Sequence, residues 1–109
     1  MPIANCFVAS APDDLDTSEI VAAWSNRSGI DSDEMTINVL EAHQAGKPYA
    51  VMAWLYLPSI WPDDAVAALS EGLAAALADA FVVEPSSIQV VTSIVASGLV
   101  VENGETVHW

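Results

Sequence analysis

Pro2 is the residue of this sequence whose type and position offer the clearest chemistry. It directly follows Met1, and a small second residue is what removal of an initiator methionine requires. We therefore expect the mature chain to begin with Pro2 as a free secondary amine. Such an amine can take a proton as a general base and return it as an acid, which is the chemistry of keto-enol and double-bond isomerisation. The other interpretation is a plain strand start, where proline is tolerated. Retention of Met1 would make this nitrogen an amide and block the mechanism.

The other residues with reactive or metal-binding side chains are not spaced as a catalytic or metal site requires. His43 and His108 are far apart and have no cysteine or carboxylate at metal-ligand spacing, so we expect no metal site and no cofactor. Cys6 is the only cysteine; its place on an apolar strand face predicts a core residue, and a single cysteine fits a reducing compartment. Without a signal-peptide pattern or a run of about 18 apolar residues, we expect a cytoplasmic protein.

The charge balance excludes several classes of partner. The chain has 15 Asp plus Glu against 2 Lys plus Arg, a net charge of -13, with Arg27 and Lys47 as its only fixed cations. It cannot build a basic surface, so we expect neither nucleic acid nor an anionic membrane as a partner. Since 53% of the 109 residues are hydrophobic, we expect one folded domain, with part of its apolar surface buried between subunits.

Two similar halves are expected to position Pro2. Pro12-Asp13-Asp14 recurs as Pro62-Asp63-Asp64, and each half follows a strand, helix, strand pattern. Expected strands span 2–9, 35–42, 49–57 and 88–95, expected helices span 17–28 and 62–81, and a hairpin with an Asn-Gly turn spans 99–107. This predicts a single α+β domain of two βαβ units, about 2–43 and 49–109, whose four-stranded mixed sheet carries both helices on one face. The strands look apolar on both sides, so we expect another copy of the chain to cover the open face.

The sequence resembles the tautomerase superfamily, which includes macrophage migration inhibitory factor and malonate semialdehyde decarboxylase. The resemblance covers nearly the whole chain and rests on Pro2-Ile3, the doubled βαβ plan, the run Tyr49 to Leu55, and the run Val83 to Val90. It implies a homotrimer whose amino-terminal proline lies in a pocket near a subunit boundary. In a partly desolvated pocket the amine holds its proton less tightly, and this allows it to act as a base near neutral pH.

The sequence departs from that family at the usual substrate-binding cation. Ser59 and Trp61 stand where several relatives have arginine or lysine, and neither makes a charge-assisted bidentate contact. The turn before the second strand also lacks the lysine of the cytokine-like members. This disfavours a dicarboxylate substrate and favours a small, neutral or monoanionic, possibly aromatic one. We expect Tyr56, Leu57, Ser59, Trp61 and Gln89 to bind it.

The resemblance therefore implies a cofactor-independent tautomerase or isomerase that uses Pro2 for proton transfer next to a carbonyl. Hydratase, dehalogenase or decarboxylase chemistry is possible on the same scaffold. Two alternatives stay open at this point. One is a catalytically weak or inactive binding or assembly protein with the same fold. The other is a ferredoxin-like dimeric α+β barrel, which has the same order of elements along the chain.

Overall fold

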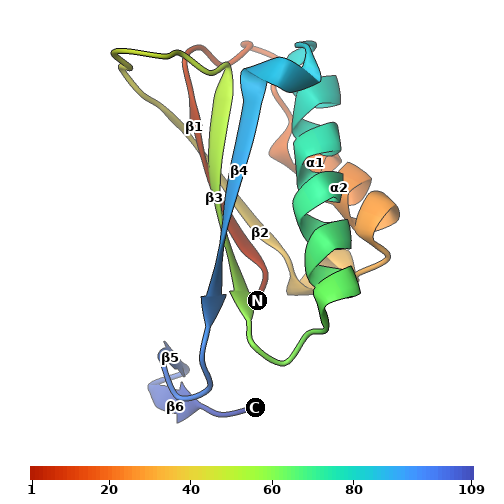
Figure 1. Cartoon of the computed structure of the whole chain (residues 1–109), viewed down its shortest axis with the longest axis vertical. Coiled ribbons are helices and arrows are strands. Elements are labelled where there is room, and N and C mark those ends of the chain that lie inside the picture. Colours follow the sequence, from red (N-terminus) through yellow and green to blue (C-terminus); the bar gives the residue numbers. More distant parts are fainter.

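The computed structural model describes residues 1–109 as two βαβ units followed by a hairpin (Figure 1). The first unit consists of β1 (Ile3–Val8), α1 (Thr17–Ser28) and β2 (Thr36–Glu41), and the second of β3 (Val51–Pro58), α2 (Asp63–Phe81) and β4 (Ile88–Val95). The 3-10 turns η1 (Ser32–Glu34) and η2 (Pro85–Ser87) lead into β2 and β4, and β5 (Val100–Glu102) pairs with β6 (Glu105–Val107). The expected α+β architecture is confirmed.

The four long strands form one mixed sheet in the order β2-β1-β3-β4. The strands of each βαβ unit are direct parallel neighbours, and β1 joins the two units by pairing antiparallel with β3. A ferredoxin-like fold contains split βαβ units, in which another strand lies between the two strands of a unit. The strand order therefore excludes the ferredoxin-like alternative.

Local sequence explains the helix ends. The Asp16 carboxylate accepts the backbone N–H of Ser18 at 3.0 Å and caps the start of α1, while Gly29, with φ 75°, ends it in the left-handed conformation that glycine favours. The start of α2 differs slightly from expectation. Pro62 has an extended backbone, with ψ 164°, and is the N-cap rather than the first helical residue.

Both helices lie on one face of the sheet and enclose the core (Figure 1). Alternate residues of β1 and β3 point toward them, which makes Cys6 fully buried, as expected. Trp24 of α1 is also fully buried and donates its indole N–H to the Leu69 carbonyl of α2 at 2.9 Å. The helices approach closely at Gly72, where an added Cβ would lie 3.3 Å from the Cβ of Arg27. Neither helix is long and apolar enough to cross a membrane.

The opposite face of the sheet carries aromatic side chains that no other element covers. Trp54 and Tyr56 alternate with the buried residues of β3, and Phe7 of β1 meets Trp54 edge to face with 5.5 Å between ring centroids. Leu40 and Val91 on the outer strands are 49% and 42% exposed. This apolar face is the one that the sequence predicts to contact another copy of the chain.

The hairpin of β5 and β6 lies beyond the end of the sheet where the chain begins (Figure 1). Its return segment is tied to the rest of the chain by Trp109. The backbone N–H of Trp109 donates to the Ser97 hydroxyl at 2.8 Å, and its indole N–H donates to the Ser59 hydroxyl at 2.9 Å. The hairpin therefore lies at the same end of the molecule as Pro2.

Candidate functional site

The start of β1 holds Pro2 in a defined position. The Pro2 carbonyl accepts the backbone N–H of Thr36 at 3.0 Å, and the next residue, Ile3, lies opposite Tyr56 of β3. The side chain of Pro2 is fully buried, and alternation along the strand places it on the same side as Ala4, toward the helices. Strand pairing on both sides thus fixes the residue that sequence reasoning selected.

A cavity of about 340 Å³ lies at the amino terminus. Its lining comes from the first residues of the chain, η1, the start of β2 and strand β5: Met1, Ile3, Asp33, Glu34, Thr36, Val100, Val101 and Glu102. Pro2 itself does not line this cavity, but its nitrogen is bonded to Met1, which does. In the full chain the Met1 amino group lies 3.7 Å from a carboxylate oxygen of Glu34.

The two candidate residues at the end of β3 face opposite sides of the sheet. Tyr56 is on the open face, where it lines a second cavity of about 410 Å³ together with Phe7, Trp54 and neighbouring side chains. Leu57 is fully buried and belongs to the core beneath the helices. Tyr56 is therefore partly exposed on the open face of the single chain, while Leu57 has a packing role.

Ser59 and Trp61 follow β3 at the same end of the molecule as Pro2. The Ser59 backbone N–H donates to the Val95 carbonyl at 2.9 Å, and its hydroxyl oxygen accepts the indole N–H of Trp109. Trp61 is half-buried and packs against the edge of the core. Neither residue lines the cavity at the amino terminus.

Gln89 lies toward the opposite end of the sheet. It is paired with Met52, whereas Tyr56 is paired with Ser93, four residues further along β4. At about 3.3 Å per residue, that separation is about 13 Å. The Gln89 amide donates to the Tyr49 hydroxyl at 3.4 Å. Within one chain, the structure therefore does not bring Gln89 together with Pro2.

Sequence reasoning missed the polar residues closest to the amino terminus. Thr36, Glu34 and Glu102 line the cavity beside Met1, and none of them was singled out as a site residue. A signal for two of them existed, because parallel pairing of the first two strands must bring the start of β2 beside the start of β1. Glu102 had no such signal, since the direction in which the hairpin folds back is not a local property.

The Cys6 thiol takes no part in this site. Burial raises its pKa to about 12, so the reactive thiolate is scarcely populated near neutral pH. Arg27 and Lys47 are also elsewhere. Arg27 donates to Asp79 on α2 at 2.7 Å, and the Lys47 ammonium lies 5.3 Å from the centre of the Tyr49 ring.

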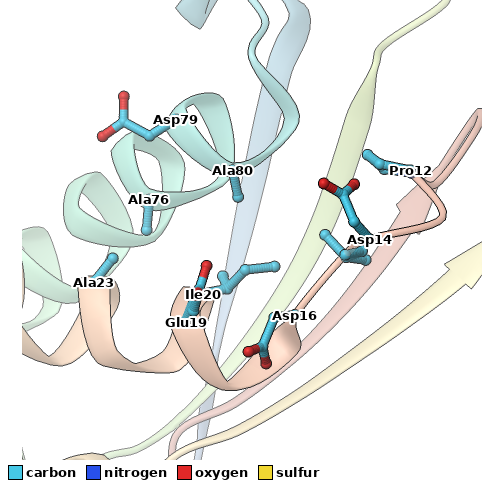
Figure 2. A pocket seen from close by; sticks show the side chains of 10 residues that line it. Pro12, Asp14, Asp16, Glu19, Ile20, Ala23, Ala76, Asp79 and Ala80 are labelled. Carbon is cyan, nitrogen blue, oxygen red and sulfur yellow. The ribbon is translucent and has the colours of Figure 1, made fainter.

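A groove of about 310 Å³ lies between the start of α1 and the end of α2 (Figure 2). Four carboxylates line it: Asp14, Asp16, Glu19 and Asp79. Figure 2 shows that they come from different segments and that the Asp16 and Asp79 groups point in different directions. No group of three or more His, Cys, Asp or Glu side chains in the structure is arranged to hold a metal ion. The groove lies in the helix layer, and Pro2 does not line it.

Comparison with known proteins shows which solved structures share this fold. No protein-family model matches the sequence, and a search of curated proteins finds no match. Solved structures do match: native fused 4-OT aligns over 96% of this chain and 95% of its own, with a TM-score of 0.81 and 16% identity. A macrophage migration inhibitory factor homologue from Prochlorococcus marinus aligns over 97% and 99%, with a TM-score of 0.73 and 14% identity.

A third match is N1, a member of the cis-3-chloroacrylic acid dehalogenase family. It aligns over 97% of this chain and 83% of its own, with a TM-score of 0.76 and 11% identity. Two further fused 4-OT structures are trimers, one asymmetric and one symmetric. The chain therefore has the fold of the tautomerase superfamily, as its sequence predicts, and at these identities the similarity establishes the fold alone.

Proposed function

We propose that the chain, after loss of Met1, is a cofactor-independent tautomerase or isomerase in which the Pro2 amine transfers a proton next to a carbonyl. The observation that carries this proposal is the position of Met1. Met1 lines the amino-terminal cavity and is bonded to the Pro2 nitrogen, so loss of Met1 would open this nitrogen to a ligand in the cavity. The β1 ladder holds that nitrogen in place, which a proton-transfer site requires.

The reaction needs one base and one hydrogen-bond donor. The lone pair of neutral Pro2 removes the proton from the carbon next to the carbonyl, and the electrons of that C–H bond form the enolate. Thr36 lines the same cavity, and we propose its hydroxyl as the donor to the enolate oxygen. Pro2 then returns the same proton to the oxygen, giving the enol; the reverse sequence ketonises an enol. The reaction consumes no oxidant or reductant.

One relative of the same fold supports carbonyl chemistry. Pt0534, with a TM-score of 0.77 and 9% identity, was crystallised after inactivation by 2-oxo-3-pentynoate, a compound with a carbonyl beside its reactive alkyne. Hydration, dehalogenation or decarboxylation would use the same amine on a different substrate. Cytoplasmic location remains our expectation from the single cysteine.

The test compares ketonisation of an arylpyruvate enol and of its methyl ester by wild type and Pro2→Ala, after mass spectrometry has confirmed that both chains lack Met1. A general acid–base group contributes about 10²- to 10⁴-fold, so we expect the enzymatic rate to fall by about 100-fold or more. Pro12→Ala is the matched control, because Pro12 lies in the interhelix groove, and its rate should equal that of wild type. A chain that keeps one residue before Pro2 should be inactive.

A non-catalytic assembly or binding protein is the second candidate. The observation that favours it is that Arg27 and Lys47 both interact with residues away from the amino-terminal cavity, so no lysine or arginine side chain lines that cavity. Equal rates for wild type and Pro2→Ala with both substrates would refute the catalytic proposal and support this one.

We further propose that the chain forms a homotrimer through the open face of the sheet. The half-exposed aromatics of this face support an apolar interface, and the fused 4-OT trimers have the same fold. Val91→Glu would place a charge in that interface and should yield smaller particles in size-exclusion chromatography with light scattering. Val82→Glu, at a valine 88% exposed beside the helices, should leave the trimer intact. A monomeric wild-type chain would refute this proposal.

A further inference from the structure

The charged side chains that line the amino-terminal cavity are all negative. Asp33 and Glu34 approach from η1, and Glu102 approaches from β5, so segments distant in sequence bring three carboxylates to the same lining. The Glu34 side chain is 66% exposed and already lies 3.7 Å from the amino group of Met1. The position that a ligand of Pro2 would occupy is therefore bordered by negative charge.

No lysine or arginine side chain of the chain offsets these carboxylates. Arg27 is paired with Asp79 in the helix layer, at 2.7 Å. Lys47 lies near Tyr49, just before β3, whose first residue Val51 pairs with Val8. Val8 is six residues from Pro2 along β1, a separation of about 20 Å in a strand. Within the chain, the terminal amine is the one group at the cavity that can carry positive charge: the amine of Met1 in the full chain, and in our proposal that of Pro2 after Met1 is lost.

We propose that Glu34 and Glu102 make this cavity select uncharged carbonyl compounds and reject carboxylates. The inference rests on the proposed function, because it names the substrate class of the Pro2 site. A carboxylate bound beside Pro2 would lose part of its hydration, find no guanidinium or ammonium side chain, and face like charges. An uncharged ketone, ester or enol bears none of these penalties and still uses the Thr36 hydroxyl as a donor.

This charge pattern distinguishes the site from one built for a carboxylate substrate. Such a site holds the substrate with a bidentate arginine or a lysine, and that cation also stabilises the enolate. Here the stabilisation of the enolate falls to the protonated amine and to a neutral hydroxyl. Glu34 and Glu102 are accordingly specificity-determining residues, and they need not touch the reacting atoms.

The experiment measures kcat/KM for ketonisation of the enol of an arylpyruvate and of the same compound as its methyl ester. The pair differs in one charge and little in shape. We expect wild type to prefer the ester by about tenfold or more, since a tenfold preference corresponds to about 1.4 kcal/mol, which is less than the repulsion between like charges a few ångströms apart near a protein surface. In Glu34→Gln/Glu102→Gln, the acid should gain about tenfold and the ester should change less than twofold.

The matched control is Glu19→Gln/Glu71→Gln, which removes the same two charges from exposed positions on the helices. If net charge alone governed the selectivity, this variant would change the ratio of kcat/KM for the ester to kcat/KM for the acid as much as Glu34→Gln/Glu102→Gln does. The inference would then be wrong. A Pro2-dependent rate that favours the acid in wild type refutes the inference alone. Absence of a Pro2-dependent rate with either substrate refutes the proposed function, and the inference with it.

Discussion

Replacing Val82 by glycine should stabilise the chain. Val82 follows the last residue of α2 with φ 53° and ψ 54°, the left-handed conformation, and its backbone N–H closes the helix by donating to the carbonyls of Ala78 and Asp79. The side chain is 88% exposed. A β-branched residue is therefore held in an unfavourable backbone conformation at a position where its side chain buries almost nothing.

The magnitude follows from three contributions. Left-handed backbone costs a residue other than glycine about 1–2 kcal/mol, and Val82→Gly removes that penalty. Glycine gives the unfolded chain extra freedom, which offsets about 0.4–1 kcal/mol of the gain. Loss of the exposed valine side chain contributes little. The net increase in the free energy of unfolding lies between about 0 and 1.6 kcal/mol; its central value of about 0.8 kcal/mol corresponds to a rise of about 3–4 °C in Tm for a domain of this size.

Thermal unfolding followed by circular dichroism tests this value. Protein concentration must be equal in all samples, because subunit association makes Tm depend on concentration. The matched control is Val101→Gly, since Val101 is 71% exposed and is not among the residues with positive φ. The Tm of this control should not rise above that of wild type. A Tm for Val82→Gly at or below that of wild type, or an equal rise in the control, would show that backbone strain at Val82 is not the governing term.

Three shorter predictions concern the core and the first helix. Trp24→Phe removes the indole hydrogen bond to Leu69 and leaves space in the core, so urea unfolding should show a loss of about 2–3 kcal/mol; a loss below 0.5 kcal/mol, on the order of a surface substitution, would contradict it. Cys6 is buried and its pKa is raised to about 12, so an aromatic disulfide reagent at pH 8 should label it only after denaturant is added. Hydrogen bonds from the side chain and then the backbone of Ser18 lower the pKa of Asp16 below its ordinary value of 3.8, so its contribution is present above that pH and is lost as pH falls through the lower, folded-state pKa. Asp16→Ala should therefore be less stable than wild type at pH 7, and the difference should close in acid; a difference that persists at the lowest pH would contradict the assignment.

The elements of this fold are well predicted by local sequence. The bounds of α1, Thr17–Ser28, agree with expectation. Asp16 caps the start of the helix and Gly29 caps its end, and each does so through a contact with a residue only a few positions away. The four strands and the hairpin were likewise predicted, since apolar runs and an Asn-Gly turn act locally. Val82 is an exception: a helix ends there in the left-handed conformation without glycine, because the chain must turn toward η2 and β4.

The composition of the candidate site was predicted only in part. Pro2 was identifiable from its position after Met1. Tyr56 pairs with Ile3, but it lines the cavity on the open face and not the amino-terminal one. Gln89 was expected to bind the substrate, but parallel register pairs it with Met52 and leaves it at the far end of the sheet. Strand register depends on contacts between segments distant in sequence, so the apolar pattern of one strand does not determine it.

Sequence alone determined which segments become helices and strands, that two βαβ units repeat, and that the chain has almost no cations to offer. These properties depend on residue type and short-range spacing. Only the tertiary structure decided that Glu34 and Glu102 share a cavity with the amino terminus, and that Arg27 is paired with Asp79 in the helix layer. Strand pairing and the fold of the hairpin bring those groups together from distant parts of the chain, and they set the charge that a substrate of Pro2 would meet.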